Sequence, residues 1–581
     1  MTSAAASPGP ARAAEAAPAS GVGERLLAWI EASHARAGAV LVALCLLCFL
    51  PGFVSLQPMD RDEPRFAQAS KQMLETGDLV DIRFQEEARH KKPVGIYWLQ
   101  AGAVAAGEAL GVPESRTTIA LYRVPSLVGG VLGVLLSYWA ALAFLTRRDA
   151  VLAAALVAAS IVLAAEARLA KTDAVLLACT TAALGALARA YLGRFTAAAR
   201  LSTPVLVAVW IAVGVGILVK GPMVIVFTGL AALVLAWRER SLRWLLALRP
   251  GLGAAITAAV VLPWFVAITL RSGGAFYAES VGHDMLGKVG GAQTYHWAPP
   301  GFYALSFFAT FWPGAALAAI AAPWAWRERR DDRVAFALAW IVPAWALLEA
   351  VPTKLPHYVL PLFPAIAILT VLAIRQGAVG PHRPFGRATA LLIPLIPAGL
   401  AAGLVVGGLA LDDVVPWAGL ALVLLSTAVA ALAWRAFNRG DAGGAAMTGV
   451  AASLLLSAGV IGLAQPVLPA LKLSPRLAAV ARGLACEGRQ GAAQVGTLGY
   501  REPSLVFLVG TGLDMHESAA ESADFLRAAP CRMVFVERRF RDAFRETTAR
   551  AGVSAAPVAT LPGFNINGGR RLEIEAYTAR P

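Results

Sequence analysis

The chain consists largely of apolar runs separated by short polar connections. An α-helix needs about 20 apolar residues to cross a bilayer core of roughly 30 Å, and thirteen runs approach that length. They are 37–56, 120–145, 150–166, 174–192, 203–219, 222–237, 252–270, 302–325, 334–350, 357–374, 388–411, 414–434 and 445–464. Outer-membrane strands would instead show segments of about ten residues with alternating polarity. The pattern therefore predicts an α-helical polytopic membrane protein with about 13 transmembrane helices.

The composition excludes a soluble enzyme. Of the 581 residues, 58% are hydrophobic and only 15% are charged, whereas soluble domains carry about 25% charged residues. The formal net charge is +14, which in a soluble protein would indicate nucleic-acid binding. Here the positive residues orient membrane helices instead, so no nucleic-acid partner is expected.

The arginines are concentrated in alternate connections, as the positive-inside rule describes for cytoplasmic loops. These connections are 146–149, 193–202, 238–251, 326–333, 375–387 and 435–444. The sequence therefore predicts that these connections are cytoplasmic. Residues 1–36, rich in Ala, Pro and Ser, are expected to form a disordered cytoplasmic tail. Because the number of spans is odd, the C-terminus is expected in the periplasm.

The expected domain organisation follows from this topology. Residues 37–466 form the membrane domain, with an outer segment at 57–119 and an outer loop at 271–301. Residues 467–581 have shorter apolar runs and are expected to form a small periplasmic α/β domain. Its predicted strands and helices are 494–498, 518–529, 532–537 and 540–551. The sequence does not decide whether its two cysteines, Cys486 and Cys531, form a disulfide, because it does not give the distance between their Cα atoms.

The outer segment 57–119 carries the densest charge. Asp62-Glu63-Pro64-Arg65 is followed by Phe66, Ala69, Met73 and Leu74 at helical spacing, which predicts an amphipathic juxtamembrane helix on the outer surface. Carboxylates at its N-terminal end are stabilised by the helix dipole. Simple capping would also account for them.

Several motifs, taken in order, resemble those of bacterial protein mannosyltransferases and lipid A aminoarabinose transferases, which are glycosyltransferases of families 39 and 83 with the GT-C fold. The motifs are Asp62-Glu63-Pro64-Arg65-Phe66-Ala67, Lys92-Pro93, Tyr97-Trp98-Leu99-Gln100-Ala101, Tyr122-Arg123-Val124-Pro125-Ser126, Arg168-Leu169-Ala170-Lys171-Thr172-Asp173, Lys220-Gly221-Pro222 and Thr353-Lys354-Leu355-Pro356-His357-Tyr358. Each motif alone is weak, but they fall in outward connections across the whole membrane part.

The resemblance implies an inverting glycosyltransferase that moves a sugar from a polyprenyl-phosphate donor to lipid A, lipopolysaccharide or another envelope acceptor on the periplasmic face. The implied partners are this donor, a lipid or glycan acceptor and membrane lipids, and we expect a monomer. The alternative is a polytopic transporter or flippase of lipid-linked sugars. Transporters place ionisable residues near the bilayer midplane and often have two corresponding halves, and the sequence shows neither feature.

The resemblance also assigns candidate residues. Asp62 is expected to act as general base or to orient the acceptor, with Asp173 and Glu63 as further catalytic acids. An acceptor that is itself a phosphate needs no base. Donor-phosphate contacts are expected from Arg65, Lys92, Lys91, Lys354, Tyr358 and His357, and the set is completed by Arg123, Lys220 and His296. No cofactor is named, and a divalent metal is an open alternative.

One position departs from the family pattern. Aminoarabinose transferases typically carry Glu-Lys-Pro-Pro where this chain has Lys91-Lys92-Pro93-Val94. A cation thus replaces an acidic residue that could hold a metal or an amino sugar. This replacement puts the aminoarabinose assignment in doubt. A second cation suits an acidic donor sugar, such as a uronic acid, as well as a neutral hexose.

Overall fold

The computed structural model describes residues 29–59, 61–195, 201–289, 296–484 and 493–579. Within these ranges, nine helical segments are long and apolar enough to cross a membrane. They are α5 (Ile119–Ala141), α8 (Asp173–Leu192), α9 (Thr203–Lys220), α11 (Pro250–Ser272), α16 (Asp332–Ala350), η5 with α17 (Pro356–Leu362 and Phe363–Arg375), α18 with α19 (Gly386–Ala390 and Leu392–Asp412), α20 (Trp417–Asn438), and α21 with η6 and η7 (Ala442–Ser457, Ala458–Ala464 and Gln465–Val467).

The four other predicted spans are also helical, but they are short or interrupted. Helices α2 (His34–Phe49) and α10 (Met223–Glu239) have 16 and 17 residues. The third is divided into α6 (Arg147–Ala158) and α7 (Ile161–Glu166), and the fourth into α14 (Phe302–Thr310) and α15 (Ala315–Arg327). The predicted polytopic helical fold is therefore confirmed, with nine segments meeting the length of a full span.

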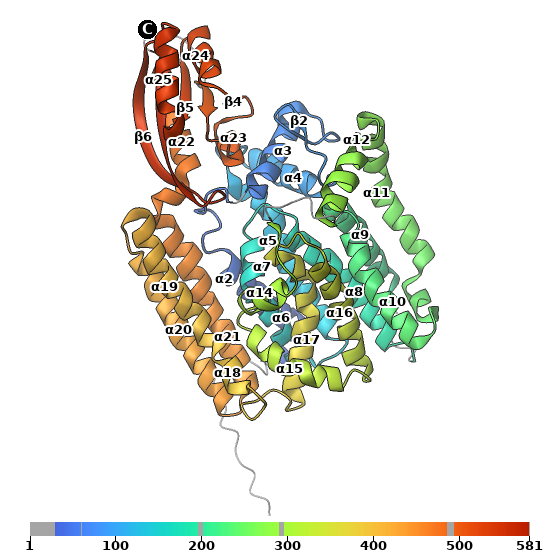
Figure 1. The fold of residues 1–581 in the computed structure, drawn as a ribbon. Coiled ribbons are helices and arrows are strands. Elements are labelled where there is room, and N and C mark those ends of the chain that lie inside the picture. Colours follow the sequence, from blue (N-terminus) through green and yellow to red (C-terminus); the bar gives the residue numbers. More distant parts are fainter. Residues whose placement is uncertain (1–28, 60, 196–200, 290–295, 485–492, 580–581) are drawn as a thin grey trace, which may run out of the picture.

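The two segments predicted to lie outside the membrane, 57–119 and 271–301, lie at one end of the helix bundle, where Figure 1 shows α3, β2, α4 and α12. The first outer segment contains α3 (Asp62–Thr76), the hairpin β1 (Arg83–Phe84) and β2 (Glu87–Ala88), and α4 (Gly95–Ala109). The second contains α12 (Ala275–Tyr277), η3 (Ala278–Leu286) and α13 (Gly287–Val289). The 3₁₀ turn η2 (Arg243–Leu248) lies in the arginine-rich connection between α10 and α11. One end of the bundle thus assembles the segments in which chemistry is predicted.

The C-terminal region folds around a mixed five-stranded sheet in the order β4-β3-β5-β7-β6. Strands β3 (Gln494–Leu498), β4 (Asp514–His516) and β5 (Arg532–Glu537) are parallel, whereas β6 (Ala555–Asn565) and β7 (Arg570–Ala579) add an antiparallel hairpin. The helical elements are η8 (Pro469–Lys472), α22 (Leu473–Arg482), α23 (Pro503–Val509), α24 (Ala519–Ala528), η9 (Arg538–Phe540) and α25 (Arg541–Arg550). Both predicted strands and both predicted helices are present, but the hairpin, β4 and α23 were not predicted.

Helix α3 does not lie open on the surface as the sequence suggested. Its apolar side, including Phe66 and Met73, packs into the membrane-side core, and its polar side is also buried. The Gln68 amide donates to the Thr511 hydroxyl at 2.7 Å, and the Lys71 ammonium donates to the Phe507 carbonyl at 3.3 Å. Because α23 and the turn after it cover the polar side, α3 lies between the membrane domain and the C-terminal domain.

Candidate functional site

Asp62 is the first residue of α3 and is partly buried. Burial raises the pKa of its carboxyl, but the positive charges of nearby Lys and Arg side chains outweigh that effect and hold the pKa below its ordinary value. The cations are Lys171, Arg89, Arg65 and Lys92. Asp62 is therefore a carboxylate at neutral pH, available to accept a proton or to orient a hydroxyl group.

Glu63 faces a different environment from Asp62, since adjacent helical residues point in different directions. Arg123 donates to both Glu63 oxygens, with Nε at 2.7 Å and Nη2 at 3.1 Å. The backbone N–H groups of Met59 and Ala170 also donate to this carboxylate, at 2.6 and 2.9 Å. Both side chains of the ion pair are fully buried. This geometry favours a structural role for Glu63 and Arg123 over the direct roles expected for them.

A second carboxylate, Asp173, begins α8 and is buried. The ammonium of Lys220, at the end of α9, donates to its Oδ1, and His357 Nε2 lies 3.7 Å from its Oδ2. The same ammonium lies 5.0 Å from the centre of the Tyr358 ring. Three separate connections between helices thus bring Asp173, Lys220, His357 and Tyr358 together.

Glu166 joins this cluster, although sequence reasoning did not select it. Its Oε1 accepts from Lys171 Nζ at 3.3 Å and lies 3.4 Å from His357 Nδ1. Its Oε2 is buried without a hydrogen-bond partner in the described part of the chain. Acidic residues are uncommon in membrane segments and often mark functional positions. The position of Glu166 at the end of a predicted span could therefore have identified it from the sequence.

The outer loop supplies two further charged residues, Asp284 in η3 and Lys288 in α13. Lys92 Nζ donates to Asp284, and Lys288 Nζ lies 2.9 Å from each Asp284 oxygen. Desolvation by burial lowers the pKa of Lys92 to about 8, and the charge of Lys288 adds to that effect. Asp284 and Lys288 are four residues apart, a spacing that places them on one helical face and could have indicated their pairing.

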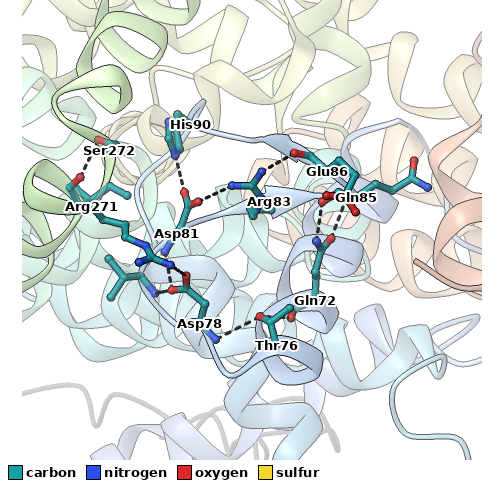
Figure 2. A network of polar contacts seen from close by, with 12 residues as sticks. Gln72, Thr76, Asp78, Asp81, Arg83, Gln85, Glu86, His90, Arg271 and Ser272 are labelled. Atoms are coloured by element: carbon teal, nitrogen blue, oxygen red, sulfur yellow. Dashed lines mark hydrogen bonds and ion pairs between the residues drawn. The ribbon is translucent and has the colours of Figure 1, made fainter. Parts of the chain in front are cut away.

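A hydrogen-bonded network fixes the chain between α3 and Lys92 (Figure 2). His90 Nε2 lies 2.7 Å from Asp81 Oδ1, and Asp81 also pairs with Arg83 at 3.0 Å. Arg271, at the end of α11, donates to Asp78 at 3.2 Å and so connects the two outer segments. The network sets the position of Lys91 and Lys92 relative to Asp62.

A cavity of about 300 Å³ lies next to these charges. Its apolar wall comes from α8, α10 and α16 and includes Leu176, Val226, Phe227, Leu347 and Leu348. Its polar lining consists mainly of charged and hydroxyl groups from both outer segments and the ends of the spans. These are Lys91, Lys92, Lys220, Ser280, Asp284, Lys288, Thr353 and Tyr358. The cavity is therefore apolar on its membrane side and cationic at its outer end.

The choice of lysine in this cavity contrasts with the rest of the chain. The sequence contains 43 Arg and only 8 Lys, yet four of those lysines and no arginine line the cavity. An ammonium is a compact charge that can contact one oxygen of a tetrahedral phosphate, and its size leaves room in a narrow site. The lining therefore fits an anionic headgroup attached to an apolar chain.

The remaining candidates occupy different positions. Lys354 is buried, and its ammonium donates to the carbonyls of Ala298 at 2.9 Å and Val351 at 2.8 Å, while its backbone N–H donates to the His296 carbonyl at 2.9 Å. The His296 side chain is exposed. Neither Lys354 nor His296 lines the cavity. This geometry favours anchoring of the outer loop over the phosphate contact expected for Lys354.

Arg65 remains close to Asp62, together with Arg89, which sequence reasoning missed. The buried Arg89 guanidinium lies 5.2 Å from the Phe66 ring centre. Burial lowers the pKa of Arg65, and the charge of Arg89 adds to the effect. The described residues contain no group of three His, Cys, Asp or Glu side chains placed to hold a metal ion.

Comparisons with known proteins show which sequences and folds the chain resembles. The family model described as dolichyl-phosphate-mannose-protein mannosyltransferase matches residues 39–273. An undecaprenyl phosphate-α-4-amino-4-deoxy-L-arabinose arabinosyl transferase of Pseudomonas aeruginosa (strain LESB58) is 31% identical over 54% of this chain and 55% of its own length. The enzyme of the same name from Pseudomonas savastanoi pv. phaseolicola (strain 1448A / Race 6) is 30% identical over 62% of this chain and 64% of its length. The chain thus spans little more than half the length of the first of these relatives.

The fold has a counterpart among solved structures. ArnT from Cupriavidus metallidurans bound to undecaprenyl phosphate superposes with a TM-score of 0.69, covering 92% of this chain and 97% of ArnT at 19% identity. Its apo structure gives a TM-score of 0.67 at 21% identity. The architecture is therefore the GT-C fold. The chain is similar in sequence to the aminoarabinose transferases named above, in agreement with the resemblance predicted from its motifs.

Proposed function

We propose that this chain is an inverting glycosyltransferase that moves a sugar from a polyprenyl-phosphate donor to lipid A, lipopolysaccharide or another envelope acceptor. The observation that carries the proposal is the cavity in which four lysines stand at the outer end of an apolar wall. A phosphate between Lys92 and Lys220 leaves the prenyl chain to run along α8, α10 and α16. The relatives named for undecaprenyl-phosphate-linked aminoarabinose support this class of donor.

The proposed reaction assigns different roles to the carboxylates of Asp62 and Asp173. An acceptor hydroxyl oxygen attacks the anomeric carbon of the donor, and the bond from that carbon to the phosphate oxygen breaks. Asp62 takes the hydroxyl proton, or orients an acceptor that is already an ionised phosphate. The leaving phosphate gains negative charge, which Lys92, Lys220 and the Tyr358 hydroxyl stabilise. Asp173 positions Lys220 through their ion pair.

The orientation of the protein completes the proposal. Helices α3, α4 and α12 lie at the end of the bundle opposite the connection between α10 and α11 (Figure 1). That connection is rich in arginine, and arginine-rich loops are typically cytoplasmic. We therefore assign the site and the C-terminal domain to the periplasmic side of the inner membrane and the N-terminus to the cytoplasm. We expect the chain to act as a monomer surrounded by membrane lipids.

The first test is mass spectrometry of envelope lipids and lipopolysaccharide from a deletion strain complemented with the wild type or with Asp62→Asn. A sugar that is lost in the deletion and restored only by the wild type supports transfer and identifies product and acceptor. Purified protein in nanodiscs gives the matched assay, in which Asp62→Asn should release polyprenyl phosphate at least about 100-fold more slowly. A lipid-linked sugar restored equally by Asp62→Asn would favour the flippase alternative.

A further inference from the structure

A second cavity, which we call the interdomain cavity, has a volume of about 840 Å³. The C-terminal domain stands over the end of α19 (Figure 1), and residues of both line this cavity. The volume is within the range of about 300–1,000 Å³ that is typical of small-molecule sites. The described residues that line it are all different from those of the lysine-lined cavity. The interdomain cavity is therefore separate from the candidate site.

The interdomain cavity lies at the carboxyl end of strand β5. Glu537 is the last residue of β5, and Arg538 and Arg539 follow it in η9. The chain runs from β3 to β4 on one side and returns to β5 on the other side of β3. In open α/β sheets, ligands bind outside the carboxyl ends of the strands at such a change of direction. The topology of the domain thus favours a ligand site at this position.

Two ion pairs in the lining are internal to the C-terminal domain. Arg539 Nε lies 3.0 Å from Glu537 Oε1, and Arg538 Nη1 lies 3.4 Å from Glu573 Oε2. Arg570, outside the lining, also pairs with Glu537 at 3.0 Å. Both carboxylates are therefore committed to arginines of the domain. The side chains of Arg538 and Arg539 are more than half exposed, so water also solvates their charge.

Two further cations of the lining, Arg476 in α22 and Arg571 in β7, have no carboxylate partner among the described residues. Each donates to a backbone carbonyl instead, Arg476 to Pro562 at 2.7 Å and Arg571 to Ala410 in α19. Both reach the same stretch of β6, because Phe564 lies opposite Arg571 and only two residues after Pro562. A guanidinium has five N–H donors. Both arginines thus retain donors with which to bind a phosphate.

The two remaining carboxylates of the lining, Asp412 and Asp413, lie at the end of α19, close in sequence to the Ala410 carbonyl that Arg571 contacts. Both Asp412 oxygens accept from the Ala470 N–H, at 3.0 and 3.2 Å. Asp413 is exposed, and neither aspartate pairs with a cation in the described part of the chain. The negative end of the α19 dipole lies at the same place and also favours a cation. The end of α19 therefore attracts a positive group beside two arginines that attract a negative one.

These charges lie where two membrane spans meet. Helix α19 ends at Asp412, and α20 begins at the exposed Trp417. Tryptophan is enriched at membrane–water interfaces. The last turns of α19 expose Val406 and Leu409, which offer an apolar surface to a hydrocarbon chain. The group that occupies this level of a membrane is a lipid headgroup.

We propose that the interdomain cavity binds a glycerophospholipid whose headgroup carries a phosphate and a primary ammonium, the chemistry of phosphatidylethanolamine. Arg476 and Arg571 bind the phosphate, and Asp412 and Asp413 bind the ammonium. The headgroup has one charge of each sign, which matches a lining with two unpaired charges of each sign. Phosphatidylcholine has no N–H donor for the aspartates, and phosphatidylglycerol has no ammonium. The bound lipid connects α19 to the β6–β7 hairpin and so joins the two domains.

Native mass spectrometry of the full-length protein tests the proposal. Delipidated protein in detergent is incubated with phosphatidylethanolamine, phosphatidylcholine or phosphatidylglycerol of identical acyl chains, and the bound lipids are counted. We expect one phosphatidylethanolamine per chain, bound at least about tenfold more tightly than the other two lipids. Asp412→Asn/Asp413→Asn should abolish this preference. Arg476→Gln/Arg571→Gln should weaken the binding of phosphatidylethanolamine by about tenfold or more.

The aspartate variants should fold, because an asparagine at position 412 still offers an oxygen to the Ala470 N–H. Asp413→Asn alone changes an exposed side chain that makes no hydrogen bond among the described residues, and it should also reduce the preference. Arg550→Gln is the matched control, since it removes an exposed cation of α25 outside the lining. It should bind phosphatidylethanolamine like the wild type.

Three outcomes overturn the inference. The first is equal binding of the three lipids, or tighter binding of phosphatidylglycerol. The second is a preference for phosphatidylethanolamine that survives both Asp413→Asn and the double aspartate variant. The third is displacement of the bound phosphatidylethanolamine by undecaprenyl phosphate, which would place the lipid in the lysine-lined cavity instead.

Discussion

Arg123 donates hydrogen bonds to both carboxylate oxygens of Glu63, at 2.7 and 3.1 Å. Glu63 directly follows Asp62 in the sequence. The guanidinium also donates to the carbonyls of Phe53, Leu56 and Gln57. This buried pair therefore connects the end of the first membrane helix, the start of α3 and helix α5. It fixes the start of α3, where Asp62 stands, although neither the pair nor Asp62 lines the cavity.

Removing the Glu63 charge should destabilise the protein. Glu63→Gln leaves Arg123 as a buried charge without a counter-ion, which typically costs about 3–5 kcal/mol. We expect a clear fall in the apparent melting temperature in nanodiscs. Asp62→Asn is the control, because it should abolish transfer while leaving that temperature nearly unchanged. A Glu63→Gln protein that melts like the wild type but does not transfer sugar would show a catalytic role for Glu63.

Donor binding should weaken as the pH rises past about 8. Burial, assisted by Lys288, lowers the pKa of Lys92 to about 8, so its ammonium loses its proton above that pH and with it its attraction for phosphate. The binding energy is thus fully present below this pKa and is lost above it. The dissociation constant for undecaprenyl phosphate, measured from pH 8 to 10, should rise by up to about tenfold per pH unit.

Lys92→Arg provides the control for this pH dependence, since a guanidinium stays charged throughout that range. The slope between pH 8 and 10 should flatten in this variant. Asp284, Lys288 and Lys220 act on Lys92 through their charges and are unchanged in this variant. If Lys92→Arg keeps the wild-type slope, loss of the Lys92 proton does not cause the pH dependence.

The contact between the C-terminal domain and α3 should be needed for a rigid site. The Thr511 hydroxyl accepts from Gln68 and donates to Glu75 at 2.6 Å. Thr511→Val removes both hydrogen bonds, each worth about 1 kcal/mol net. We expect faster amide hydrogen exchange in α3 and slower transfer. Thr560→Val, an exposed position in β6, is the matched control, and equal exchange in the two variants would show that the contact does not restrain α3.

Peptide mapping under non-reducing conditions should recover Cys486 linked to Cys531. Cys531 is disulfide-bonded, whereas Cys486 lies outside the described residues, and Cys45, Cys48 and Cys179 are free. Reduction should lower the stability of the C-terminal domain by about 2–5 kcal/mol, as is typical for a small extracytoplasmic domain. Alkylation of Cys486 without prior reduction would contradict this pairing.

The sequence alone predicted the helical membrane fold, its resemblance to a family, and half of the candidate site. All thirteen apolar runs are helical because a helix satisfies its own backbone hydrogen bonds within the segment, so local hydropathy is enough to define it. Strands β3 and β5 were predicted from their short apolar runs, whereas the β6–β7 hairpin was not, since its outer strand β6 mixes exposed, partly exposed and buried positions and lacks a continuous apolar run.

Only the tertiary structure decided which charged residues stabilise the fold and which are placed to contact a ligand. Asp62 and Glu63 are neighbours of the same chemical type, yet Asp62 lies among several cations and Glu63 is fixed by Arg123. Lys354 was grouped with Lys92 by motif, but its ammonium is occupied by two backbone carbonyls. Asp284 accepts a hydrogen bond from Lys92, 192 residues away in the sequence, and also binds Lys288. A charged side chain acquires its role from the partners that surround it, and packing of distant segments supplies those partners after the local sequence has already set the helices.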